Sequence, residues 1–104
     1  MKKRPRRQSL SEIAGEIRNI ARDSARVFFT AHAENEMRND QLTVTEVLQA
    51  LRGCRVTEVQ PLERYKSEGR TATGEVVAAI VQILTFKRNG KGLRVITVWR
   101  IKLR

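Results

Sequence analysis

The feature that most constrains the fold is a long apolar run in the C-terminal half of the chain. Residues 76–84 read Val-Val-Ala-Ala-Ile-Val-Gln-Ile-Leu, and Gln82 is their one polar side chain. The β-branched residues favour a strand over a helix, and the scarcity of polar positions favours a strand buried inside a sheet. Because 104 residues can bury one hydrophobic core, that core is expected to lie on a β-sheet.

The run is expected to pair with neighbouring strands. Residues 88–92 contain an Asn-Gly turn, which predicts a hairpin with the residues that follow. Residues 26–30 are aromatic and β-branched and are expected to be extended, and a further strand is expected at residues 55–60, before Pro61. Residues 62–70 are polar and contain a glycine, and they are expected to form a loop.

The last segment, residues 93–104, alternates between two side-chain faces, as a strand does. The predicted faces are Leu93, Val95, Thr97, Trp99, Ile101 and Leu103 on one side and Arg94, Ile96, Val98, Arg100, Lys102 and Arg104 on the other. Trp99 shares its predicted face with Val95 and is therefore expected to lie in the core. The basic end of the other face is expected either to bind phosphates or to protect a sheet edge.

The N-terminal half predicts helices over residues 9–22 and 31–39, and a third that ends near Gly53. Ser9 and Thr43 are each followed three residues later by a glutamate, which is the spacing of a capping box at a helix start. Helices followed by strands predict an α+β fold, in which the N-terminal helices pack on one face of a mainly antiparallel β-sheet.

Basic residues exceed acidic residues, and the excess is uneven. Lys and Arg number 21 and Asp and Glu number 11, which gives a formal net charge of +10. Residues 1–7 carry +5, residues 8–60 carry −2 and residues 61–104 carry +7. We therefore expect a flexible basic arm over residues 1–8 and a single domain over residues 9–104. Clustered Lys and Arg suit a polyanion such as a nucleic acid, or an acidic protein partner.

Several classes of protein are disfavoured. The single cysteine, Cys54, excludes an internal disulfide framework and favours a reducing, cytoplasmic location. One histidine with scattered acidic residues argues against a zinc site, and no metal or cofactor is predicted. No apolar run reaches about 18 residues, and no apolar block follows the basic start. Neither a membrane span nor a secretory signal is therefore expected.

Two groups of residues are candidates for chemistry. His32, at the start of the second predicted helix, is the only imidazole and a candidate general acid or base. The alternative is a partly buried histidine that orders the turn into the helix. Arg64, Lys66 and Arg70 lie close together in the sequence, with Tyr65 among them. Such cations pair with phosphates and a base stacks on such a ring; the alternative is a solvated loop.

Two segments are similar to a known bacterial family. Residues 27–38 read Val-Phe-Phe-Thr-Ala-His-Ala-Glu-Asn-Glu-Met-Arg, and residues 42–53 read Leu-Thr-Val-Thr-Glu-Val-Leu-Gln-Ala-Leu-Arg-Gly. With the strand Val-Ile-Thr-Val-Trp at residues 95–99, they resemble the small bacterial domain of unknown function family 4258. The resemblance covers nearly the whole chain, from residue 10 to residue 101.

The resemblance implies a RelE-like fold, with helices on a curved antiparallel sheet. That superfamily includes ribonuclease toxins of bacterial toxin–antitoxin pairs, and members of this family are often labelled MqsR-like. The implied activity is a metal-independent endoribonuclease, with His32 as general acid or base and with Arg38, Arg70 and Arg100 holding the scissile phosphate. The nucleic-acid contacts expected beside this catalytic set are Arg64, Tyr65, Lys66, Arg94 and Lys102.

The implied partners are RNA, including ribosome-associated mRNA, and an antitoxin whose acidic segment covers the basic groove; a homodimer is compatible with this reading. The chain departs from the family at Glu36 and Asp40, where members usually carry arginine or another basic residue. Two acidic side chains beside His32 would repel an RNA phosphate and would move the RNA toward residues 64–70 and the C-terminal strand. The alternatives to a nuclease are a non-catalytic RNA- or DNA-binding module and a basic protein that binds an acidic protein partner.

Overall fold

The computed structural model describes residues 8–88 and 90–102. The predicted basic arm lies outside these residues except for Gln8, and so do Leu103 and Arg104 of the last predicted strand. The described elements are, in chain order, α1 (Leu10–Ala21), the short 3₁₀ helix η1 (Ser24–Arg26), β1 (Val27–Phe29), α2 (Ala31–Asn39), α3 (Val44–Arg52), β2 (Arg55–Gln60), β3 (Arg64–Arg70), β4 (Val76–Phe86) and β5 (Gly90–Ile101).

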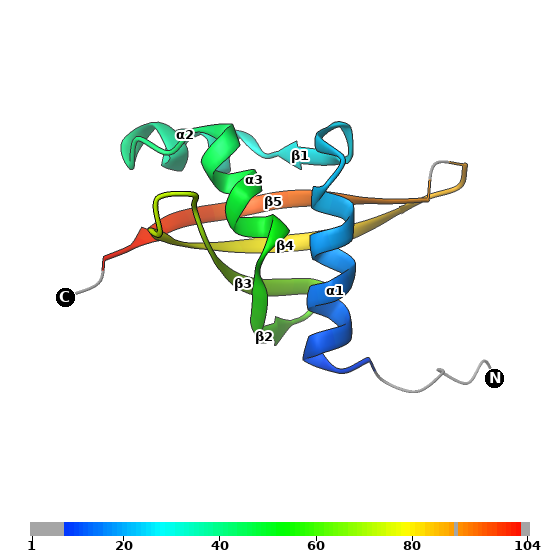
Figure 1. Ribbon diagram of the computed structural model, residues 1–104. Coiled ribbons are helices and arrows are strands. Elements are labelled where there is room, and N and C mark those ends of the chain that lie inside the picture. Colours follow the sequence, from blue (N-terminus) through cyan, green and yellow to red (C-terminus); the bar gives the residue numbers. More distant parts are fainter. Residues whose placement is uncertain (1–7, 89, 103–104) are drawn as a thin grey trace.

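The five strands form one open sheet, and the helices pack over one of its faces (Figure 1). The strand order is β1-β5-β4-β3-β2; β1 runs parallel to β5, and the other neighbours are antiparallel. In Figure 1, α1 and α3 lie across the sheet, whereas α2 lies beside β1 and next to β5. This arrangement confirms the predicted α+β fold. None of the described helices is long and apolar enough to cross a membrane.

The helices begin where the sequence predicts because side chains cap their first N–H groups. Both predicted capping boxes are present. In the first, the hydroxyl of Ser9 accepts from the N–H of Glu12 at 3.1 Å, and the Glu12 carboxylate accepts from the N–H of Ser9 at 2.9 Å. The Thr30 hydroxyl accepts from the N–H of Ala33 and donates to the carbonyl of Ile96, each at 3.0 Å. The start of α2 is therefore tied directly to β5.

The core lies between the helices and the sheet face that they cover. Ile17 of α1, Leu51 of α3 and Val81 of β4 are fully buried there, together with Val95 of β5. Burying a side chain of this kind stabilises a fold by about 1.5–3 kcal/mol. The long apolar run is the middle strand of the sheet, β4, as the sequence predicts.

The prediction of a loop over residues 62–70 is wrong, because residues 64–70 form strand β3. This strand pairs with β4 along its whole length and with β2 on its other side. Its positions facing the helices are Tyr65, Ser67 and Gly69, so the aliphatic alternation that marks a strand is missing. Gly69 lies directly under α3, where an added Cβ would come within 1.9 Å of the carbonyl oxygen of Ala50. A residue without a side chain is therefore required where helix and strand meet.

A β-bulge changes which side chains of β5 face the helices. The pairing of β5 with β4 shifts by one residue at Ile96. As a result Val95 and Val98 are both fully buried in the core, although regular alternation would place them on opposite faces. Trp99 consequently lies on the face away from Val95, and the prediction that the two share a face is wrong.

The second face of the sheet carries no helix in the part of the chain that the structure describes (Figure 1), and we call it the open face. Residues paired directly across antiparallel or parallel neighbours point to the same face, so the register identifies its members. The polar and aromatic members are Phe28 of β1, Arg94, Thr97 and Trp99 of β5, Gln82 and Phe86 of β4, Arg64, Lys66, Glu68 and Arg70 of β3, and Arg55, Glu58 and Gln60 of β2.

Candidate nucleic-acid interface

The open face brings together basic side chains that lie far apart in the sequence. Gln82 of β4 pairs with Arg64 of β3 on one side and with Arg94 of β5 on the other, so the three residues form one row across the sheet. Neighbouring strands are about 4.8 Å apart, which places the two arginines about 10 Å apart at the backbone. Sheet pairing alone makes these two cations neighbours.

Lys66 and Trp99 lie in two adjacent rows of the open face, because Lys66 pairs with Ile80 of β4 and Trp99 pairs with Ala78. The Nζ of Lys66 lies 5.6 Å from the centre of the Trp99 ring, a favourable contact between a cation and an aromatic face. Tyr65 lies on the opposite face and is only 8% exposed. Its ring is therefore closed to a nucleobase, contrary to the expectation from the sequence, and Trp99 is the aromatic side chain next to Lys66 on this surface.

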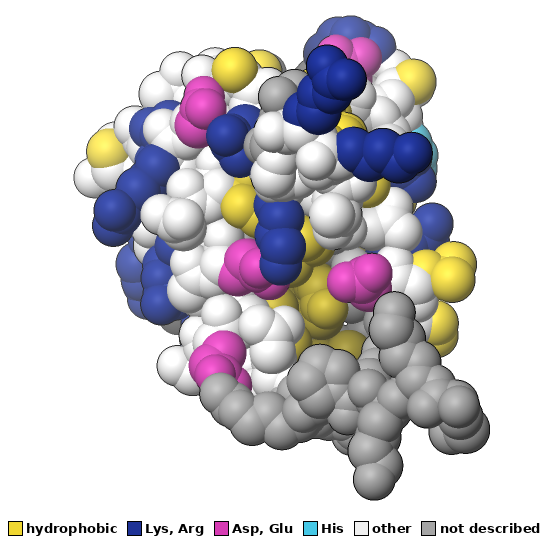
Figure 2. All heavy atoms as spheres, turned by 90° about the vertical axis from the view of Figure 1, so that its right-hand side faces the viewer, with side chains coloured by type: hydrophobic (Ala, Val, Ile, Leu, Met, Phe, Trp, Pro, Cys, Tyr) yellow, Lys and Arg dark blue, Asp and Glu magenta, His cyan; other side chains and the backbone are white. Residues whose placement is uncertain are grey.

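Basic groups outnumber acidic groups on the open face. Glu68 is paired with Arg55 at 3.3 Å, and Glu58 accepts from the amide of Gln60 at 3.1 Å. Figure 2 shows that Lys and Arg side chains also spread over the end of the molecule at the right of Figure 1, with isolated acidic groups between them. The cations of the open face are Arg55, Arg64, Lys66, Arg70 and Arg94, and its acids are Glu58 and Glu68.

His32 lies in the first turn of α2, and its side chain is 68% exposed. Its Nε2 is 3.4 Å from Oε2 of Glu36, one helical turn later. The other carboxylate oxygen of Glu36 accepts from the N–H of Val98 at 3.0 Å and from the hydroxyl of Thr97. Glu36 is therefore held by β5 through one oxygen, while its other oxygen lies beside the exposed imidazole. A carboxylate next to a histidine is one of the pairings that acid–base catalysis uses.

Two acidic side chains near the end of α2 are directed at the backbone of β5. Glu36 accepts from the N–H of Val98, and Asp40 accepts from the N–H of Arg100 at 3.2 Å. Positions one helical turn apart are about 6 Å apart, and alternate strand residues about 6.8 Å apart, so the helix and the strand match. Because β1 pairs with β5 only up to Val95, these carboxylates satisfy an edge that would otherwise be unpaired. An arginine at either position could not accept these hydrogen bonds.

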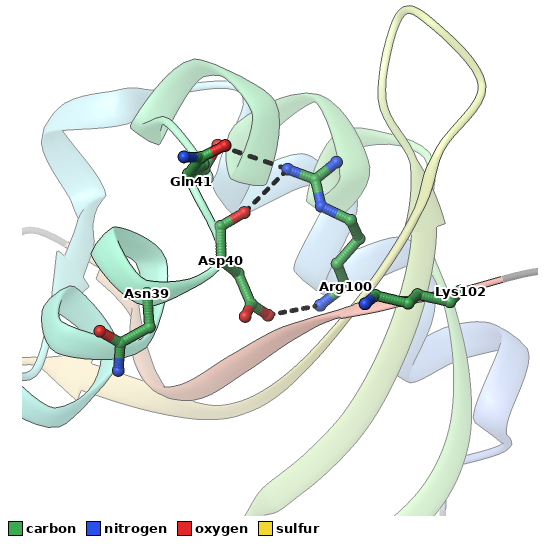
Figure 3. Close-up of a pocket in the computed structure, with 5 residues that line it drawn as sticks. All are labelled: Asn39, Asp40, Gln41, Arg100 and Lys102. Carbon is green, nitrogen blue, oxygen red and sulfur yellow. Dashed lines mark hydrogen bonds between the residues drawn. The ribbon is translucent and has the colours of Figure 1, made fainter.

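Arg100 is fixed beside the connection between α2 and α3 (Figure 3). Its Nη2 donates to the carbonyls of Asp40 at 3.1 Å and Gln41 at 3.3 Å, and its Nη1 pairs with the carboxylate of Glu75. These bonds use much of the guanidinium to hold the connection in place, which leaves less of it for a phosphate. The hollow beside it, about 280 Å³ in volume, is lined by Asn39, Asp40, Gln41, Arg100 and Lys102.

The four residues that the resemblance assigned to catalysis do not converge in the structure. Arg38 lies about 120° round α2 from His32, at about 100° per residue. Arg70 is at the end of β3 on the open face, whereas Arg100 points to the side that the helices cover. The charged neighbour of His32 is Glu36 rather than any of the predicted arginines.

Reasoning from the sequence missed the contact of Glu36 with His32 and several members of the open face. The spacing of four residues between His32 and Glu36 on a predicted helix was a usable signal for their contact. Phe86 reaches the open face at the end of β4, where Phe28 of β1 also lies. Their proximity carried no sequence signal, because it depends on the parallel pairing of β1 with β5.

Cys54 is not a nucleophile in this fold. It is buried at the end of α3, and this burial raises the pKa of its thiol to about 11, an effect that Arg18 opposes only in part. The thiol therefore stays protonated, and unreactive, at neutral pH. Within residues 8–88 and 90–102, no three His, Cys, Asp or Glu side chains gather as a possible metal site.

A family model described as a domain of unknown function (DUF4258) matches residues 29–100. The chain belongs to this family. The matched region runs from the end of β1 to Arg100 and includes His32, Glu36 and most of the open face, whereas α1 precedes it. Comparisons with curated proteins and with solved structures give no match.

Proposed function

We propose that this protein binds single-stranded RNA on the open face of its sheet. The observation that carries the proposal is the row of Arg64, Gln82 and Arg94 across three strands, on a face that no described helix covers. Lys66 and Trp99 continue this surface. Cations suited to phosphates and rings suited to bases thus share one surface, as in sheets and grooves that bind single strands.

The mixture of side chains favours a nucleic acid over an acidic protein segment. An acidic peptide would use the cations but would gain nothing specific from rings next to them. A single-stranded nucleic acid offers phosphates at regular intervals and flat bases between them, so it can use both kinds of side chain. The row contains Gln82, whose amide nitrogen donates one hydrogen to the carbonyl of Leu62 at 2.8 Å and has a second hydrogen that can donate to a phosphate or ribose oxygen.

The salt dependence of binding tests this proposal. Affinity of the full chain for a short mixed-sequence single-stranded RNA is measured at several salt concentrations, for the wild type and for Arg94→Gln and Lys66→Gln. Arg22→Gln is the matched control. Arg22 is an exposed cation at the C-terminal end of α1, and it lies away from the open face. Each lost phosphate contact is expected to reduce the slope of log affinity against log salt by about 0.7.

The outcome shows whether the open face or the overall net charge of the protein attracts the RNA. The two open-face variants are expected to lower the slope, and Arg22→Gln to leave it unchanged. Equal effects of all three variants would show that net charge alone attracts the RNA. Absence of RNA binding by the wild type at low salt would overturn the proposal.

A second candidate function rests on a separate observation, the contact between His32 and Glu36. In this second proposal, the protein is a metal-independent endoribonuclease of the toxin type, with a RelE-like, MqsR-like fold. His32 would take the proton of a ribose 2′-hydroxyl, whose oxygen then attacks the adjacent phosphorus and forms a 2′,3′-cyclic phosphate. The bond from phosphorus to the 5′-oxygen of the next nucleotide breaks, and this oxygen takes up a proton from water. The partner of such a toxin would be an antitoxin whose acidic segment covers the open face.

Growth and RNA integrity after induced expression in a bacterium test the second candidate. The wild type is compared with His32→Ala and with Glu36→Gln, which keeps an acceptor for β5 but removes the charge beside the imidazole. Growth arrest with RNA cleavage that both variants relieve would support the nuclease. Arrest that persists in His32→Ala, with RNA binding intact, would leave the non-catalytic binding module.

A further inference from the structure

Two exposed phenylalanines lie together at the hairpin end of the sheet. Phe28 of β1 is 45% exposed and Phe86 of β4 is 37% exposed. Their ring centroids are 6.1 Å apart and the rings are nearly perpendicular, at 78°. An exposed pair of this kind is unusual, because both rings would be more stable inside the core unless they met a partner.

Both rings belong to the open face. Phe28 pairs with Arg94 of β5, and Phe86 continues the alternation that places Gln82 on this face. The Phe86 ring lies down over Gly92, since an added Cβ at Gly92 would come within 2.5 Å of its Cε2. The absence of a side chain at Gly92 therefore gives the ring its place on the sheet.

Exposed cations lie on or directly after the strands that carry the aromatic pair. Arg94 is exposed, and its side chain makes no hydrogen bond or ion pair with the described residues. Lys87 and Arg88 follow Phe86 directly and are also exposed. Lys91 differs from these three, because it is paired with Glu16 of α1. The pair is thus an apolar platform inside a basic surface, which suits a flat base attached to a phosphate chain.

We propose that Phe28 and Phe86 form a nucleobase-stacking subsite for single-stranded RNA, with Arg94 holding a neighbouring phosphate. This inference rests on the proposed function, because it assigns a base contact to the same open face. A base that stacks on the platform would cover exposed ring surface, and the strand would continue past Arg94 toward Lys66 and Trp99. Stacking accepts every base, so the subsite supplies affinity with little sequence preference.

An abasic RNA separates this inference from the proposed function. Affinity of the full chain is measured for a short single-stranded RNA and for the same RNA with abasic riboses, which keeps every phosphate. The variants are Phe86→Leu and Phe28→Leu, which keep an apolar side chain without the ring, and Val44→Ala, which shortens an exposed apolar side chain on α3. A lost stacking contact is expected to lower affinity for the intact RNA by about five- to a hundredfold.

The wild type is expected to prefer the intact RNA, and each phenylalanine variant is expected to lose most of that preference while its salt dependence stays unchanged. Val44→Ala is expected to match the wild type. Gly92→Ala, which displaces the Phe86 ring, provides a second route to the same loss and is compared at equal folded fraction. Intact RNA bound equally by wild type and both leucine variants, with Arg94→Gln still weakening it, would overturn the stacking subsite alone. Loss of the Arg94 dependence as well would overturn the proposed function.

Discussion

The two faces of the sheet are built from the same strands and are used differently. On the face that the helices cover, Val81 and Val95 are fully buried. On the open face, Arg94 directly precedes Val95 in β5 and is exposed, and its side chain makes no polar contact with the described residues. Because successive side chains of a strand point to opposite faces, one face of the sheet stabilises the fold and the other is available to a ligand.

Arg94 and Arg100 of the same strand show this division most clearly. Arg100 is fixed by Glu75 and by the carbonyls of the α2–α3 connection. Both are even-numbered residues and would share a face in a regular strand, but the bulge at Ile96 sends them to opposite faces. One arginine thus stabilises the fold and the other is free to bind a phosphate.

The largest expected effect comes from the covered face. Leu51→Ala leaves a cavity beneath α3, where Leu51 is fully buried, and is expected to lower the free energy of unfolding by about 2–5 kcal/mol. Leu62→Ala is the matched control, because Leu62 is 72% exposed and its loss should change stability by less than about 0.5 kcal/mol. Urea unfolding measures both. Equal losses would contradict the division into faces.

The contact between α3 and β3 predicts the next effect. Gly69→Ala would force the helix and the strand apart, and a loss of about 1–3 kcal/mol in unfolding free energy is expected. Gly53→Ala provides the control, because an added Cβ at Gly53 meets nothing within 4 Å. The two melting temperatures can be compared directly, and a Gly69→Ala protein as stable as Gly53→Ala would show that the contact is looser than described.

Glu36 and His32 are neighbours with different expected effects on stability. Glu36→Ala leaves the N–H of Val98 without its acceptor, and a loss of about 1–2 kcal/mol is expected. His32→Ala removes an exposed side chain and should change the unfolding free energy by less than about 0.5 kcal/mol. A large loss in His32→Ala would mean that the histidine orders the turn, which is the structural alternative to a catalytic role.

Cys54 predicts a pH dependence of stability. Its thiol has a pKa of about 11 in the folded protein because it is buried, whereas an unfolded chain releases this proton at a lower pH. The contribution of the buried thiol to the free energy of unfolding is therefore fully present below the pKa of the unfolded chain. It is lost as the pH rises from there through the pKa of the folded protein. Stability of the wild type should fall more steeply than that of Cys54→Ala from about pH 8.5 upward. Parallel curves would contradict the burial of the thiol.

Much of the fold followed from local signals. The capping boxes at Ser9 and Thr43 fixed the starts of α1 and α3, and the apolar run identified the middle strand. Strand β3 was missed because its inward positions, Ser67 and Gly69, fit under a helix instead of filling space. The face of Trp99 was misassigned because a bulge leaves no mark in a pattern of alternating residues.

The candidate site was less accessible to sequence reasoning. Arg64, Lys66, Arg70 and Arg94 were predicted as candidate residues and Arg55 was not, but which residues share a surface depends on long-range pairing. Arg64 and Arg94 meet only through β4. In the sequence, the negative charges of Glu36 and Asp40 suggested a surface that repels an RNA phosphate. The structure shows that both carboxylates accept hydrogen bonds from backbone N–H groups of β5, which only the position of the helix along the strand reveals.

The fluorescence of Trp99, the only tryptophan, tests the central claim most directly, because this side chain lies on the open face beside Lys66. The full chain is titrated with single-stranded RNA at low salt, while binding is followed in parallel by the polarisation of a labelled RNA. RNA on the open face predicts that Trp99 emission changes with the same midpoint as the polarisation, and that added salt abolishes both changes. RNA binding that leaves Trp99 emission unaltered would place the RNA elsewhere on the molecule and contradict the claim.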